Sequence, residues 1–339
     1  MSKTTFATDN ALTKKLWDEK LFRDAVKESY FSRFMGAGSD TIVQVKDVLT
    51  KSKGDTVTFG IRMRLSGTGV TDGQVLEGAE EALTTYDDTV TLHQYRHAVR
   101  DNGELDRQRA MFDINAESVQ ALSDWGSEKI DSLAFDAILD SPTRIFYKTS
   151  SGSTSTTSAA TAKAALTGAD GKITPAFVSY IKAYAKTGGS RTIVPIRPVR
   201  VEGKNYYVLL VHPDAVYDWK NDPSVQQFLR EAEVRGPTNP LFTGAVAIYD
   251  GVVIHEHENI PIADDAGSGG DVSWSKGVFM GAQALVWAWG KRVATVQKKF
   301  DYDNEWGHAW GIIAGTNKPV FNSLDYGSLG VYVARTDIS

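Results

Sequence analysis

The chain has 339 residues, 42% of them hydrophobic, so it is long enough to bury a substantial core. It carries 37 Lys and Arg against 42 Asp and Glu, and this net charge of -5 argues against a protein that grips DNA through a basic face. The absence of cysteine excludes disulfides, thiolate nucleophiles and iron–sulfur clusters. The N-terminus is charged where a signal peptide needs an apolar core, and no segment has the roughly 18 apolar residues of a membrane span, so we expect a cytoplasmic protein.

Residues Leu12 to Phe34 have the pattern of an amphipathic helix, which Gly36 and Gly38 would end. A helix at a terminus, followed by a linker, often docks on another subunit. Packing on its own domain is the alternative that the pattern leaves open. We expect residues 1–53 to form an N-terminal arm, with contacts to a neighbouring subunit through Leu16, Trp17 and Leu21.

The segment KGDTVTFGIRMRLSG alternates apolar and polar residues, which is typical of a half-buried strand. A second strand is predicted from Asp88 to Val99, where a change of phase near Tyr95 suggests a bulge. Together these strands predict a long antiparallel ribbon over residues 54–100. Its tip of roughly 20 residues would be unusual inside a compact domain, so we expect the tip to reach a partner.

From Glu104 to Asp140 apolar residues recur at steps of three and four, with a single glycine, Gly126, and no proline. This pattern predicts one helix of about 50 Å at a rise of 1.5 Å per residue, ended by Pro142. A helix of that length acts as a strut. It would occupy most of the segment 101–148.

The serine-rich segment 149–161 is predicted to be an exposed loop, because it is polar and of low complexity. Residues 149–262 otherwise alternate helical and strand patterns, which indicates a mixed α/β module. They include a buried strand in NYYVLLVHP and a short helix from Val225 to Val234. Residues 263–339 contain a strongly apolar segment, 277–291, and short strands near residues 311–313 and 330–334.

Two candidate metal motifs are weak. His255 and His257 are spaced to chelate a metal from one face of a strand, but no third ligand is evident. The segment DYDNEWG resembles a calcium loop, but Trp306 stands where that loop requires glycine. Trp287 and Trp289 are better explained by core packing than by ligand stacking. We therefore predict no catalytic, cofactor-binding or metal-binding residue.

Seven stretches in order along the chain carry a resemblance to a known family. They are GDTVTFGIRMRLSGTGVTDGQVLEGAEEAL, LHQYRHAVRDNGELDRQRAMFDI, VHPDAVYDW, GPTNPLFTGAVAIYDGVVIHEHENI, FMGAQALVWAWG, DYDNEWGHAWGIIAGTNKPVFN and DYGSLGVYVART. The sequence resembles the N-four-type major capsid proteins of tailed bacteriophages over nearly its whole length. The serine-rich segment 149–161 lies outside this pattern.

The resemblance implies an α+β fold of the Hong Kong 97-like type, with an N-terminal arm, an extended hairpin called the E-loop, a P-domain with a long spine helix, and an A-domain. It implies a non-enzymatic shell subunit that forms hexamers and pentamers around packaged double-stranded DNA, bound only non-specifically. A separate scaffolding protein and a portal are expected during assembly in the bacterial cytoplasm, and a decoration or cement protein is a further candidate partner. No cofactor and no membrane are implied. A nanocompartment shell protein of the same fold and a metalloenzyme using His255 and His257 are the alternatives.

Charges predict where copies of the chain would meet. Residues Gly60 to Asp88 hold six acidic residues and two arginines, whereas four arginines cluster just beyond them. We expect the acidic tip of one copy to contact the basic cluster of the next. The residues concerned are Glu77, Glu80 and Glu81 on the tip, and Arg96, Arg100, Arg107 and Arg109 in the cluster.

Overall fold

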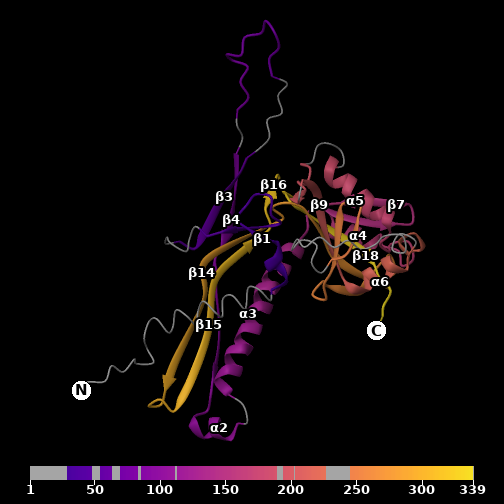
Figure 1. Cartoon of the computed structure of the whole chain (residues 1–339). Helices are drawn as coiled ribbons and strands as arrows, with labels where there is room; N and C mark the ends of the chain where they lie inside the picture. Colours follow the sequence, from indigo (N-terminus) through magenta and orange to yellow (C-terminus); the bar gives the residue numbers. More distant parts are fainter. Residues whose placement is uncertain are drawn as a thin grey trace.

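The computed structural model describes residues 29–47, 54–62, 69–82, 85–110, 113–188, 194–201, 203–226 and 245–338. Three parts can be distinguished in Figure 1. A long hairpin and a long helix run side by side in an elongated part. A nine-stranded sheet with short helices forms a compact body at one end of it. A thin two-stranded ribbon projects from their junction, away from the rest of the molecule.

The elements of the elongated part and the ribbon are η1 (Tyr30–Phe34), β1 (Met35–Gly36), β2 (Val43–Lys46), β3 (Thr56–Arg62), β4 (Thr85–Thr91), β5 (His93–Arg100), α2 (Glu104–Arg109), α3 (Ile114–Leu139), β14 (Leu285–Phe300) and β15 (Glu305–Asn317). Those of the body are β6 (Ile145–Thr149), β7 (Gly152–Thr156), α4 (Ala159–Ala164), α5 (Pro175–Thr187), β8 (Val199–Val201), β9 (Lys204–Val211), α6 (Pro213–Asn221), β10 (Ala245–Tyr249), β11 (Val252–Glu256), β12 (Ile262–Ala266), β13 (Val272–Met280) and β18 (Ser328–Ala334). The small hairpin β16 (Val320–Phe321) and β17 (Leu324–Asp325) lies between β15 and β18.

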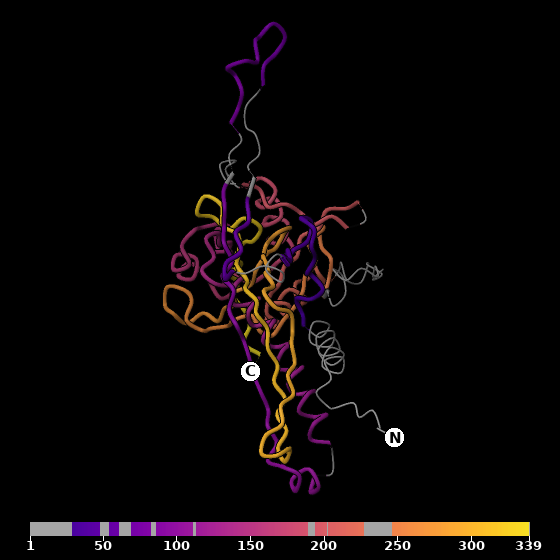
Figure 2. Tube along the Cα trace, turned by 90° about the vertical axis from the view of Figure 1, so that its left-hand side faces the viewer, coloured from indigo at the N-terminus to yellow at the C-terminus, as the bar shows by residue number. Residues whose placement is uncertain are grey.

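The elongated part is a five-stranded sheet with the order β1-β2-β14-β15-β5, against which α3 packs (Figure 2). The backbone of α3 approaches closely at Gly126, where an added Cβ would lie 2.7 Å from the Trp310 ring of β15. Trp287 and Trp310 are both buried in this core, as is Trp289. The core role predicted for Trp287 and Trp289 is therefore confirmed.

The long helix predicted from Glu104 to Asp140 is interrupted. The short α2 ends at Arg109, the backbone of Ala110 is extended, and α3 begins at Ile114 after Asp113. The Asp113 side chain accepts a hydrogen bond from the Asn115 N–H at 3.0 Å, which makes it an N-cap. A capping residue satisfies the first free N–H groups of a helix, so it starts a new helix instead of continuing an old one.

The ribbon is shorter than predicted. β3 pairs only with β4, in a register from Thr56 opposite Thr91 to Arg62 opposite Thr85, and β5 pairs with β15 instead. The change of phase near Tyr95, which predicted a bulge, instead marks the change from β4, which pairs with β3, to β5, which pairs with β15. The end of β4 lies very close to β15 at this point. A Cβ added to Gly315 would lie 2.2 Å from the Thr91 carbonyl oxygen.

The body is a sheet with the order β10-β11-β9-β13-β18-β6-β7. In addition, β8 pairs with β9 and β12 pairs with β13. Its apolar core contains residues of α5 and α6, including Phe177, Ile181 and Trp219. α5 begins with a Thr174 cap and Pro175 and ends at Gly188, whose φ of 66° favours glycine. The serine-rich segment is not a simple loop, because β7 pairs with β6 and Ser158 caps α4.

The described end of the predicted N-terminal arm belongs to the core of its own chain. Residues 30–34 form the 3-10 helix η1 instead of the last turns of an α-helix, and β2 pairs with β14. Asp131 of α3 fixes this segment: it accepts hydrogen bonds from the Ser29 hydroxyl at 2.6 Å and the Tyr30 N–H at 2.7 Å, both buried. Residues 29–46 are therefore not a free arm. None of the described helices is long and apolar enough to cross a membrane.

Candidate assembly surfaces

The ribbon tip, residues 69–82, is the most exposed part of the described chain. Every residue in it is exposed except Val70, which is partly buried. Two adjacent apolar side chains point into solvent, Val75 at 74% and Leu76 at 59% exposure. Glu77, Glu80 and Glu81 lie beside them, so the tip combines an apolar pair with negative charge. Such a surface is suited to a partner that offers an apolar recess with positive charge at its rim.

Three of the four predicted arginines have acidic partners within their own chain. Arg100 is ion-paired with Glu305, Arg107 with Asp101, and Arg109 with Asp106 at 3.7 Å. The Arg107 and Arg100 guanidinium groups also lie over the rings of Trp306 and Phe300. Arg96 is exposed on β5 and has no ion-pair partner among the residues that the structure describes. Arg96 is thus the one arginine of the predicted cluster that has no ion-pair partner among the described residues.

A groove of about 220 Å³ lies beside Arg96 on the sheet face formed by β14, β15 and β5. Its floor is mostly apolar and includes Ala294, Val296 and Ile313, with Val296 51% exposed. Lys291 stands at the groove together with Arg96, and both are exposed. Sequence reasoning missed this groove because it joins β5 to the hairpin of β14 and β15, which lies much further along the chain. The available signal was the apolar Val296 between the polar residues Thr295 and Gln297 of β14.

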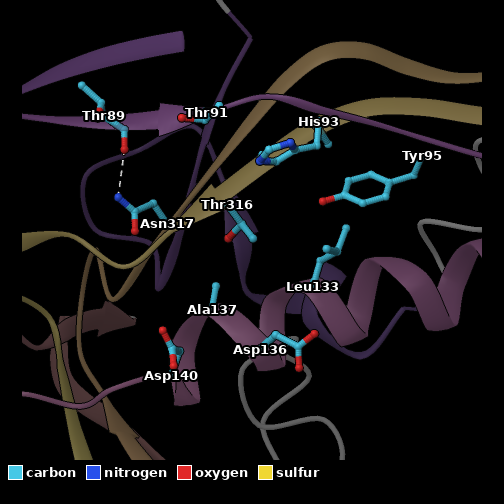
Figure 3. A pocket seen from close by; sticks show the side chains of 12 residues that line it. Thr89, Thr91, His93, Tyr95, Leu133, Asp136, Ala137, Asp140, Thr316 and Asn317 are labelled. Atoms are coloured by element: carbon cyan, nitrogen blue, oxygen red, sulfur yellow. Dashed lines mark hydrogen bonds between the residues drawn. The ribbon is translucent and has the colours of Figure 1, made fainter. Parts of the chain in front are cut away.

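A second cavity, of about 520 Å³, lies where the ribbon joins the elongated part (Figure 3). Thr91, His93 and Tyr95 line one wall, and Leu133 and Asp136 of α3 line another. The Asn317 side chain donates a hydrogen bond to the Thr89 carbonyl oxygen at 2.9 Å, which ties the ribbon base to β15. The cavity therefore lies between α3 on one side and β4, β5 and β15 on the other.

His255 and His257 lie among aromatic side chains. The His257 ring is 4.5 Å from the Tyr30 ring and 4.6 Å from the Phe135 ring, and His255 packs against Phe34 at 5.4 Å. β11 ends at Glu256, so His257 follows the strand instead of sharing its face with His255. Burial lowers the pKa of His257, although the Asp131 charge opposes this shift. Within the described ranges, no group of three or more His, Cys, Asp or Glu could hold a metal ion.

Some predicted contact residues lie outside the described part of the chain. Leu16, Trp17 and Leu21 of the arm are among them, and so is most of the helix predicted from Val225 to Val234. Of the others, the structure places Glu77 and Glu80 on the ribbon tip and Arg96 on the face of the elongated part. Tip and groove thus occupy different parts of one chain, as a head-to-tail contact between copies requires.

A chain whose ribbon projects from its core, with exposed apolar residues at the tip, has the build of a structural subunit that works in an assembly. Comparison with known proteins agrees with this class. A family model described as phage capsid protein matches residues 5–336. The major capsid protein of Pseudomonas phage KPP25 is 30% identical, with 98% of this chain and 97% of that protein covered.

Solved structures show the same fold. The capsid of Ralstonia phage GP4 superposes with a TM-score of 0.80 at 26% identity, and both chains are covered completely, at 100%. The capsid asymmetric unit of cyanophage Pam1 has a TM-score of 0.73 at 22% identity, with 99% of each chain covered. The chain therefore belongs to the phage capsid protein family. It is a major capsid protein, a subunit of the shell of tailed phages.

Proposed function

We propose that copies of this chain assemble as hexamers and pentamers into an icosahedral shell around the packaged double-stranded DNA of an N-four-type tailed bacteriophage. In this proposal the ribbon is the E-loop of a Hong Kong 97-like fold, the elongated part with α3 is the P-domain, and the body is the A-domain. A separate scaffolding protein and a portal act during assembly in the bacterial cytoplasm, and a decoration protein is a further partner. The chain has no catalytic role.

The exposed ribbon tip carries this proposal. Val75 and Leu76 leave large apolar surfaces in water, and burial of such surface is favourable by about 25 cal/mol per Å². A single chain gains nothing from this arrangement, whereas a shell of identical chains can cover every tip. The net charge of -5 fits a shell that holds DNA without gripping it.

Within the shell, the tip of one copy docks in the groove of a neighbour. The groove has an apolar floor for Val75 and Leu76, and Arg96 and Lys291 at its rim face the acidic residues of the tip. Exposed ion pairs of this kind are worth under about 1 kcal/mol each, but a shell repeats each of them many times. Charge complementarity therefore selects the register, while apolar burial supplies most of the stability.

Negative-stain electron microscopy tests the proposal directly. The purified chain, expressed with and without the expected scaffolding protein, should form closed shells of uniform size. Monomers of 37.1 kDa under every condition would contradict shell formation. Particles that enclose a protein cargo instead of DNA would favour a nanocompartment shell.

A further inference from the structure

The small hairpin of β16 and β17 lies where the ribbon, the elongated part and the body meet (Figure 1). Asn322 and Ser323 alone connect its strands, with φ values of 48° and 61°. Two such residues in succession give the type I′ turn, whose twist matches that of the paired strands. The Tyr326 N–H donates a hydrogen bond to the Pro319 carbonyl oxygen at 2.9 Å, which closes the base of the hairpin. We call this compact segment, residues 317–326, the bracket.

The bracket is fixed to the end of α3 and to the segment before β6. The Lys318 ammonium donates a hydrogen bond to the Asp140 carbonyl oxygen at 2.7 Å and forms an ion pair with Asp325 at 3.1 Å. The Asp325 carboxylate accepts a hydrogen bond from the Thr143 N–H at 2.9 Å, and the Asp325 N–H donates one to the Thr143 hydroxyl at 2.7 Å. The side chains of Lys318 and Asp325 are only 8% and 1% exposed. Separation of this pair would leave a buried charge, so this side of the bracket is rigid.

The other side of the bracket holds the ribbon. Tyr86 and Asp88 lie on one face of β4, because residues two apart in a strand point to the same side. The Asp88 carboxylate accepts hydrogen bonds from the Val320 N–H at 3.1 Å and from the Asn317 side chain at 3.4 Å. The Tyr86 ring meets the Phe321 ring edge-on, with 4.8 Å between the ring centroids. A carboxylate and an aromatic ring thus join the ribbon to a segment that α3 holds in place.

A small change in the direction of the ribbon at this point becomes a large displacement at its tip. The chain from Asp88 to Leu76 spans up to about 40 Å, at about 3.3 Å per residue. A rotation of about 10° at Asp88 would therefore move Leu76 by about 7 Å. Apolar side chains are in contact only when their atoms approach within about 4.5 Å. The direction of the ribbon therefore decides whether Val75 and Leu76 reach a groove on a neighbour.

We propose that the bracket is a positioning device for assembly, which sets the direction of the ribbon through Asp88 and Tyr86 and ties that direction to the end of α3 through Lys318 and Asp325. A tip that is held in the docking direction loses less conformational entropy when it binds, so assembly is favoured. Asp88 and Tyr86 are positioning residues, because they act on the tip through the ribbon and not by contact with a neighbour. This inference rests on the proposed docking of the tip and names the residues that direct it.

The variants are placed on the ribbon side of the bracket, because substitution of the buried Lys318 or Asp325 would threaten folding. Asp88→Ala removes the acceptor of both hydrogen bonds, and Tyr86→Ala removes the ring contact. Asp87→Ala is the matched control, because Asp87 is exposed and points to the opposite face of β4. Circular dichroism should show the wild-type fold for all three. Asp88→Asn keeps one acceptor oxygen and provides a milder variant with an intermediate effect.

Distance measurements on the unassembled subunit test the positioning role directly. The chain has no cysteine, so spin labels can be attached at Asp72→Cys on the ribbon tip and Glu128→Cys on α3, both exposed positions. Double electron–electron resonance then gives the distribution of distances between tip and helix. We expect a broader distribution for Asp88→Ala and Tyr86→Ala than for the wild type and Asp87→Ala. Equal widths in all four proteins would overturn the proposal.

Shell assembly gives the functional measurement. Asp88→Ala and Tyr86→Ala should each lower the yield of closed shells by about tenfold, as expected when a binding segment loses its fixed orientation, whereas Asp87→Ala should assemble as the wild type does. Broader distances combined with wild-type yield would also overturn the positioning role. Absence of wild-type shells under every condition would instead contradict the proposed function. The distance measurement would still decide whether the bracket directs the ribbon, because it needs no shell.

Discussion

α3 and the ribbon tip differ sharply in how much of each is buried. α3 has eleven buried residues, and its core-facing side contacts both the sheet of the elongated part and the segment 29–34. The ribbon tip has no fully buried residue between positions 69 and 82. The fold therefore depends on α3 and would survive most changes in the tip. Assembly has the reverse dependence, because the tip still has apolar surface to bury in Val75 and Leu76.

Asp131 provides the strongest test of this contrast. Asp131→Ala leaves the Ser29 hydroxyl and the N–H groups of Tyr30 and Phe31 without their buried acceptor. Each such loss costs about 1–3 kcal/mol, so we expect the unassembled subunit to lose about 3–5 kcal/mol in a chemical denaturation experiment followed by circular dichroism. Asp136→Ala on the exposed side of α3 is the control, with a change within about 0.5 kcal/mol. Equal effects of the two would show that α3 does not hold this segment.

Gly315 of β15 tests the close contact between the ribbon base and the elongated part. Gly315→Ala places a methyl group against the Thr91 backbone, so the ribbon base must shift. We expect a loss of about 1–3 kcal/mol in subunit stability, typical of overpacking. Gly168→Ala is the matched control, because a Cβ there meets nothing within 4 Å. A loss no larger than that of the control would mean that the ribbon base shifts away from the new methyl group without a cost in stability.

Sequence reasoning succeeded where a local pattern had one explanation. Alternation identified the strand at Thr56–Arg62, and spacing identified α3 and its apolar side. It failed where a tertiary partner decided the outcome. The shift in alternation after Leu92 marks a change of sheet, which only the distant β15 reveals. Likewise, nothing near Tyr30 shows that Asp131, about a hundred residues away, accepts its N–H.

The same limit applies to the assembly surfaces. Composition located the acidic tip, because acidic residues are dense there and basic ones are few. It did not show which arginines are available, since Arg100 and Arg107 are paired with Glu305 and Asp101. Glu305 is some two hundred residues from its partner in sequence. Charge counts therefore predict that a contact exists but not which cations make it.

The ribbon tip should affect assembly without affecting folding. Reversal of Glu80 and Glu81 to lysine should change subunit stability by less than about 0.5 kcal/mol, because both residues are exposed. Shell yield at low salt should fall, and the salt dependence of assembly should weaken, since the tip no longer attracts Arg96 and Lys291. Light scattering during assembly at several ionic strengths measures both. Replacement by glutamine should give an intermediate result, and unchanged yield in the lysine variant would refute the contact.

Two partly buried histidines, His257 and His308, should make folding weakly sensitive to acid. Burial lowers the pKa values of His257 and His308 below their ordinary value of 6.5, so the folded state disfavours protonation. Their contribution is complete above about pH 6.5 and is lost as the pH falls through the lowered values. Denaturation at pH 7.5 and pH 5 should show the loss. His257→Phe keeps the ring contacts and should reduce the pH dependence, and an unchanged dependence would exclude His257 as a source.

The last prediction concerns an effect that should be absent. Some capsids of this fold join neighbours by an isopeptide bond from a lysine on the E-loop to an asparagine, which requires an unprotonated amine at the mobile tip. Here no lysine occurs between Lys53 and Lys129, and arginine cannot replace it because its guanidinium stays protonated. The shell must then rely on buried area and ion pairs summed over many contacts. Mature particles boiled in detergent should run as one band of 37.1 kDa. A ladder of multimers that survives this treatment would show covalent links, and substitution of Lys51 and Lys53 by arginine would then identify the amine.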